Sequence, residues 1–263
     1  MRDLAIASLN CAGHQRFGRD TGLELRPDAL EFDSSRRPAC VVIDPVSEHR
    51  FCLWGGALTC YDNEGVIRWA AQLDVLLQGQ DGGSSEGSWV YAAFLARPNS
   101  VFAAHSGGTL ATIDVTSGGK VVELVGELEG GVLAAAWTAD EALVAVATGS
   151  GAMVVMTSQW DVVAEASLPG MGISVEPVHL TWRNDSQHLV VSFCPASVND
   201  GCLGPRCLRV LTQDLSVTTV GRNEDSSTIL GLHAGSIAWS PDGELIACGM
   251  SVPARSRLQV LFA

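Results

Sequence analysis

The chain has 263 residues, of which 47% are hydrophobic and 17% charged, and this composition excludes an intrinsically disordered chain. The net charge is −13 at pH 7, with 16 basic against 29 acidic residues, which disfavours binding to the phosphate backbone of nucleic acids. We therefore expect a folded protein that does not bind nucleic acid directly through this stretch.

The chain carries no clear targeting or membrane segment. Met1–Leu9 is only weakly apolar and contains Asp3, so it does not fit a secretory signal peptide. The longest uncharged stretch, 142–160, could span a bilayer by length, but the turn-forming residues 148–151 divide it into two strands of a hairpin. We expect no membrane span and a cytoplasmic protein that could also enter the nucleus.

Three segments share one pattern, an aromatic residue followed by a short polar turn and an apolar strand, and two earlier segments are weaker copies of it. In chain order the segments are 42–54, which is the weakest copy, 93–102, 136–144, 181–190 and 238–246. The aromatic residues of the last four are Phe94, Trp137, Trp182 and Trp239, at intervals of 43, 45 and 57 residues. Such spacing is the first sign of a repeat architecture.

Each copy is followed by further short strands. After Trp137 come apolar strands at 143–148 and 152–157, and a third begins at Val162. Four short strands every 40 to 45 residues are typical of a β-propeller blade. We predict an all-β fold, a WD40-like β-propeller in which about five to six blades are visible, with 1–263 as the N-terminal part of that propeller. The last strand, 257–262, ends without a partner strand, so we expect an incomplete ring.

The aromatic residue before each turn is expected to pack between adjacent blades. Phe94, Trp137, Trp182 and Trp239 are therefore the predicted structural blade anchors. His233, a few residues before the last of them, is expected to form a structural hydrogen bond within its blade.

No residue set points to catalysis, a cofactor or a metal. Residues 83–87 satisfy G-x-S-x-G, but they lie in a polar Gly/Ser-rich loop rather than between a strand and a helix. The eight cysteines contain no C-x2-C pair, and the loop with Cys194, Cys202 and Cys207 has a role that the sequence leaves open. We expect no catalytic, cofactor-binding or metal-binding residues.

The order of the copies resembles the N-terminal propeller of the largest subunit of the Elongator complex, the IKAP family. The similarity is clearest from about Val132 onward and rests on the segments 137–157, 178–195 and 238–247, and the opening Met1-Arg2-Asp3-Leu4 is also similar. The loop 196–206 is longer than is usual in the family, and nothing corresponds to its second propeller or its helical C-terminal region.

The resemblance implies a non-catalytic scaffold in an assembly that modifies the wobble uridine of tRNA. Its implied partners are other Elongator subunits, including a radical-chemistry subunit and a second WD40 subunit. Two alternatives stay open: a generic WD40-type interaction scaffold in another pathway, and a propeller hydrolase that uses a carboxylate-lined channel.

Overall fold

The computed structural model describes residues 39–77, 87–171, 177–194, 207–220, 233–252 and 255–262. These residues form 19 β-strands and one short 3-10 turn, η2 (Asp74–Leu77). The first sheet has β1 (Cys40–Ile43), β2 (Arg50–Trp54), β3 (Ala57–Tyr61) and β4 (Ile67–Gln72). The second has β5 (Trp89–Leu95), β6 (Ser100–His105), β7 (Thr109–Asp114) and β8 (Val122–Glu127).

The other three sheets follow the same order. The third has β9 (Val132–Trp137), β10 (Leu143–Thr148), β11 (Ala152–Thr157) and β12 (Val162–Ser167). The fourth has β13 (His179–Trp182), β14 (His188–Phe193), β15 (Cys207–Thr212) and β16 (Val217–Val220). The fifth has three strands among the described residues, β17 (His233–Trp239), β18 (Leu245–Val252) and β19 (Arg255–Phe262). We refer to the sheets as blades 1 to 5.

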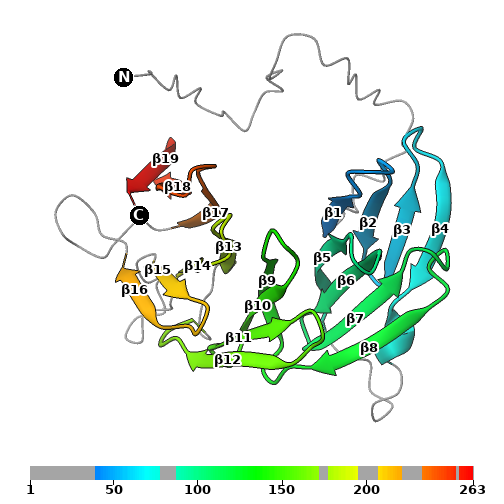
Figure 1. Ribbon diagram of the computed structural model, residues 1–263, viewed down its shortest axis with the longest axis horizontal. Coiled ribbons are helices and arrows are strands. Elements are labelled where there is room, and N and C mark those ends of the chain that lie inside the picture. The colour runs from blue at the N-terminus through cyan, green and yellow to red at the C-terminus, as the bar shows by residue number, and fades with distance from the viewer. Residues whose placement is uncertain are drawn as a thin grey trace, which may run out of the picture.

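The blades stand side by side in chain order. The first strand of each blade contacts the first strand of the next, from β1 through β5, β9 and β13 to β17. Figure 1 shows the five blades along an open arc with blades 1 and 5 at its two ends. The predicted all-β propeller is therefore confirmed, with five blades described and no closed ring among them.

Four apolar clusters fill the spaces between neighbouring blades. Because side chains alternate between the two faces of a strand, the side chains of the central strand β10 belong to two of these clusters. Val144 and Val146 belong to the cluster shared with blade 2, whereas Ala145 and Ala147 belong to the cluster shared with blade 4. The second strands β6, β10 and β14 are almost wholly buried for this reason. Burial on both faces explains why these strands are continuous apolar runs in the sequence.

The fourth strands lie on the outside of the arc and are largely exposed. The pairing of β4, β8, β12 and β16 with its neighbour shifts register once in each blade. A register shift of this kind twists an edge strand and makes it a poorer template for another chain. The repeated irregularity therefore protects the exposed edges of blades 1 to 4.

Individual sequence predictions can be located in this fold. The uncharged stretch 142–160 forms the hairpin of β10 and β11, as predicted, and 149–151 form its turn. Among the described residues, no helix is long and apolar enough to cross a membrane. Residues 83–86 of the G-x-S-x-G match, the N-terminal segment 1–38 and Cys202 lie outside the described residues.

Candidate interaction face

The predicted blade anchors occupy one repeated position. In every blade, the last or next-to-last residue of the first strand pairs with the residue seven positions later on the second strand. The pairs are Ile43 with Arg50, Phe94 with Val101, Trp137 with Val144, Trp182 with Leu189, and Trp239 with Ile246. The four predicted anchors are thus structurally equivalent, and Ile43 holds the corresponding place in blade 1.

Each aromatic anchor contacts the blade that precedes it in the sequence. The indole Nε1 of Trp182 donates a 3.0 Å hydrogen bond to the carbonyl oxygen of Ala136 in blade 3. The indole Nε1 of Trp239 donates in the same way to the carbonyl oxygen of Thr181 in blade 4, at 3.3 Å. Both acceptors directly precede the anchor of their own blade, so one blade-to-blade contact is repeated along the chain.

The first two anchors make the corresponding contact through ring packing. Phe94 stacks on Phe51 of blade 1 with 5.6 Å between ring centroids. Trp137 meets Phe102 of blade 2 edge to face at 5.6 Å and Trp160 at 5.8 Å. Aromatic pairs in these geometries stabilise a packed interface beyond their buried area alone.

The turns that follow the anchors lie on one common face of the arc. Glu141, in the β9–β10 turn, accepts hydrogen bonds from the backbone N–H groups of Ala96 and Arg97 in the β5–β6 turn, at 3.0 and 3.1 Å. Asn184, in the β13–β14 turn, donates to the carbonyl oxygen of Pro241 in the β17–β18 turn at 3.1 Å. Ser186 Oγ of blade 4 donates to Asp140 Oδ1 of blade 3 at 3.4 Å, so the first turns of blades 2 to 5 lie at the same end.

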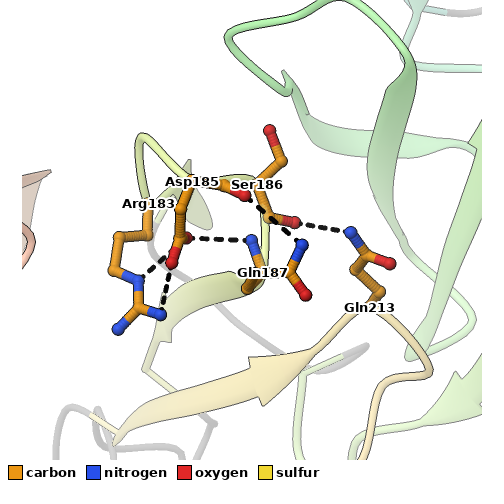
Figure 2. Close-up of polar contacts among 5 residues, drawn as sticks. All are labelled: Arg183, Asp185, Ser186, Gln187 and Gln213. Atoms are coloured by element: carbon orange, nitrogen blue, oxygen red, sulfur yellow. Dashed lines mark hydrogen bonds and ion pairs between the residues drawn. The ribbon is translucent and has the colours of Figure 1, made fainter.

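The β13–β14 turn shows how these turns are held (Figure 2). Arg183 donates from Nε to Asp185 Oδ1 at 2.9 Å, and its terminal nitrogen lies 2.5 Å from Oδ2. The backbone N–H of Gln187 also donates to Asp185, at 3.0 Å. Gln213, from the β15–β16 turn, donates to the carbonyl oxygen of Ser186 at 2.8 Å and so joins the two turns of this blade.

The turns at this face are rich in carboxylates. Since the first and third turns of an antiparallel blade lie at the same end, both contribute. Of the 17 acidic residues in the described part of the chain, 12 lie at this face, Asp114 as the last residue of β7 and 11 in the turns: Asp44, Glu48, Asp62, Glu64, Asp140, Glu141, Asp161, Asp185, Asp214, Asp242 and Glu244. The basic residues of the same turns within the described part are Arg97, Lys120 and Arg183. We call this surface the turn face.

Several turn aspartates have lowered pKa values because the turns donate hydrogen bonds to them. The ion pair with Arg183 lowers the pKa of Asp185 to about 2. The hydroxyls of Thr138 and Ser240 are the main cause of lowered pKa values at Asp140 and Asp242. These carboxylates stay charged at neutral pH, so the turn face is negative.

Turn closure accounts for most of the aspartates. Asp140, Asp185 and Asp242 each stand three residues after an anchor and accept a backbone N–H two residues further on. Asn and Asp side chains close turns in this way. The three-residue spacing between anchor and aspartate therefore could have predicted these turns from the sequence. No sequence pattern indicates the hydrogen bonds between turns of different blades.

A second polar network lies at the opposite end of blades 1 and 2. Trp89 donates from Nε1 to Asp74 Oδ1 at 3.1 Å, and its ring meets the buried His105 edge to face at 5.3 Å. His105 Nδ1 accepts the backbone N–H of Gly107 at 3.0 Å, and burial is the main cause of the lowered pKa of His105. His105 is thus a neutral structural residue, and sequence reasoning did not single it out.

The structure describes two of the three cysteines whose role the sequence left open. Cys194 is buried at the end of β14, and Cys207 is half-buried at the start of β15. Among the described residues, no group of three or more His, Cys, Asp and Glu side chains could hold a metal ion.

Comparisons with known proteins show what this chain resembles. Residues 63–176 match the family model of the ELP1 first N-terminal beta-propeller. Elongator complex protein 1 of Schizosaccharomyces pombe is 20% identical to the chain over 216 residues. The resemblance to the Elongator largest subunit is confirmed. That match covers 64% of this chain but 16% of the yeast protein, so the chain corresponds to a small part of its relative.

The fold is also shared with a solved structure. A chain in the crystal structure of the mitotic checkpoint complex superposes with a TM-score of 0.56 at 12% identity, over 81% of this chain and 56% of that chain. This likeness supports the propeller fold and says nothing about function. The likeness to the Elongator first propeller thus rests on the match of residues 63–176, and the blade geometry agrees with it.

Proposed function

We propose that this chain is part of a non-catalytic scaffold subunit in an Elongator-type complex that supports modification of the wobble uridine of tRNA. The match of residues 63–176 to the Elongator first propeller carries the proposal. The chain would act through protein–protein contacts with other Elongator subunits, including the radical-chemistry subunit and a second WD40 subunit.

The surface of the described blades supports a role in binding proteins. An arc of turns held by hydrogen bonds between blades presents side chains with a reduced entropic cost of ordering loops. The turn face carries 12 acidic residues against Arg97, Lys120 and Arg183, which disfavours direct contact with tRNA phosphates. On this proposal tRNA is held by other parts of the assembly, which works in the cytoplasm with a nuclear pool as a second location.

The proposal is tested by tagging the endogenous protein and identifying its partners by mass spectrometry. We expect the radical-chemistry subunit and the second WD40 subunit in near-equal amounts with the tagged protein. The matched control is an unrelated WD40 protein tagged in the same way. Consistent recovery of a different set of partners, without any Elongator subunit, would replace this proposal with a scaffold of another pathway.

A further inference from the structure

The third turns of blades 1, 3 and 4 share one backbone geometry. The first residue of each turn donates its N–H to the carbonyl oxygen of the fifth residue, and the fourth residue donates its N–H to the carbonyl oxygen of the first. The fourth residue is Gly65, Trp160 or Leu215, with φ of +84°, +70° and +64°. Glycine adopts this region of φ freely, whereas a bulky side chain is strained in it. Trp160 therefore needs contacts that compensate for the strain of its backbone.

Burial accounts for Leu215 fully and for Trp160 only in part. Leu215 is 4% exposed and belongs to the apolar cluster between blades 3 and 4. Trp160 is half-buried; its ring stacks on Phe102 of blade 2 at 5.5 Å between centroids and meets Trp137 edge to face at 5.8 Å. Trp137 is half-buried as well. The two indoles thus form a partly exposed aromatic surface where blades 2 and 3 meet, and we call them the indole pair.

Two buried polar atoms beside the indole pair have no hydrogen-bond partner within the described part of the chain. They are Nε1 of Trp137 itself and Oγ of Ser100. Ser100 is 5% exposed. Because side chains alternate along a strand, it lies on the same face of β6 as Phe102, which contacts both indoles. The anchor indoles of Trp182 and Trp239 do have acceptors, so this junction differs from its neighbours in its unused hydrogen-bonding groups.

The junction of blades 4 and 5 shows the kind of group that an indole of the turn face accepts. There the guanidinium of Arg183 lies 5.8 Å from the centroid of the Trp239 ring. Asp185 holds the same guanidinium by a 2.9 Å hydrogen bond from Nε. An arginine stacked on an indole and paired with a carboxylate is a stable arrangement of cation, ring and counter-charge. No cation of the described chain occupies the corresponding place over the indole pair.

Carboxylates stand around the indole pair. Asp161 follows the second indole directly and is exposed, and Asp140 and Glu141 lie in the β9–β10 turn, which follows the first. Glu141 is fixed in place because it accepts two backbone N–H groups from blade 2. A cation over the indole pair would therefore find an aromatic face and negative charge together, as Arg183 does at the junction of blades 4 and 5.

We propose that the indole pair is a docking site for an arginine-bearing segment of a partner protein. The inference rests on the scaffold role proposed above and names the chemistry of one of its protein contacts. A guanidinium can stack on the indole pair and donate to Asp161 and Glu141 at the same time, which the point charge of a lysine ammonium does less well. The segment also brings backbone carbonyl and N–H groups, which are partners for the Trp137 indole and the Ser100 hydroxyl.

Two peptides of equal charge test the proposal on the full-length protein. Fluorescein-labelled arginine and lysine nonapeptides are titrated separately, with anisotropy as the readout, at about 0.15 M salt, where charges further apart than about 8 Å are screened. Attraction by the acidic turn face alone would bind both peptides equally. We expect the arginine peptide to bind at least about tenfold more tightly. Equal affinities, or no binding of the arginine peptide, would overturn the proposal.

Substitutions locate the site on the turn face. Trp160→Leu removes one indole but introduces the residue that blade 4 carries at the same turn position, so the turn should still form. The preference for arginine should then fall to about twofold or less. Asp161→Asn should weaken binding of the arginine peptide at least about threefold, whereas Glu64→Gln, which removes an exposed charge from the third turn of blade 1, should change it less than about 1.5-fold. Equal effects of the two charge substitutions, or an arginine preference that survives Trp160→Leu, would count against the site.

The result is separable from the scaffold role. Peptide binding without a preference for arginine would remove this inference even where the tagged protein recovers Elongator subunits. An arginine preference that depends on Trp160, found together with a different set of recovered partners, would keep the site and assign it to a scaffold of another pathway.

Discussion

The indole of Trp182 offers the sharpest test of how the blades hold together. The ring lies in the apolar cluster between blades 3 and 4 and is 6% exposed, and its Nε1 donates to the carbonyl oxygen of Ala136 at 3.0 Å. Trp182→Phe keeps an aromatic ring and removes that donor. Ala136 is also paired with Ala145 in the β9–β10 ladder, so its carbonyl keeps an acceptor role there, and the loss is that of one hydrogen bond, about 0.5–1.5 kcal/mol.

The smaller ring adds a second cost. Replacing indole by phenyl removes on the order of 40 Å² of buried apolar surface, which is about 1 kcal/mol at ~25 cal/mol per Å². We therefore expect Trp182→Phe to lower the free energy of unfolding by about 1.5–2.5 kcal/mol. Urea unfolding followed by far-UV circular dichroism measures this, since tryptophan fluorescence is itself changed by the substitution.

Two controls separate the hydrogen bond from ring packing. A benzothienyl analogue of tryptophan at position 182 keeps the ring size without the N–H, and should cost about 0.5–1.5 kcal/mol by itself. Trp239→Phe should cost less than Trp182→Phe, because Trp239 is only half-buried and its bond to Thr181 is 3.3 Å long. A loss below about 1 kcal/mol for Trp182→Phe, or equal losses at the two positions, would refute the reasoning.

Three other predictions follow from named contacts. Gly131→Ala should destabilise the chain by about 2–3 kcal/mol, because φ is +78° and an added Cβ would lie 2.0 Å from a backbone oxygen of the β6–β7 turn. Gly126→Ala, where nothing lies within 4 Å, should change unfolding by less than about 0.5 kcal/mol in the same urea titration. His105, whose pKa is lowered by burial, stabilises the fold above its unfolded pKa of about 6.5, and this contribution is lost as pH falls; wild type should therefore lose more stability than His105→Gln between about pH 7.5 and 5.5, and equal losses would contradict this. Asp185 should titrate near pH 2 by NMR, and Arg183→Lys should raise that pKa toward about 4; an ordinary value in the wild type would show that the ion pair does not form in solution.

The sequence was sufficient to predict the repeat and the fold. After each of the anchors Trp137, Trp182 and Trp239, an aspartate follows three residues later and an apolar strand comes next. All of these residues are close together in the sequence. The pattern can therefore be recognised without knowledge of the tertiary structure. The copy around Ile43 was the weakest because its anchor position holds an aliphatic residue.

Contacts between blades could not be predicted in the same way. The hydrogen bonds that the backbone N–H groups of Ala96 and Arg97 donate to Glu141 join residues that are 45 and 44 positions apart. The indoles of Trp182 and Trp239 donate to backbone carbonyls. Every residue has a backbone carbonyl, so the sequence does not show which one accepts the bond. Charge clustering on the turn face likewise arises only when turns from several blades meet at one end of the arc.

The central claim, that this propeller belongs to an Elongator-type scaffold, is tested most directly on tRNA. The endogenous protein is depleted, and modified wobble uridines in purified tRNA are quantified by mass spectrometry of nucleosides. We predict a loss of these modified nucleosides that re-expression of the full-length protein restores. Unchanged modification after complete depletion would contradict the account and leave the propeller fold without this function.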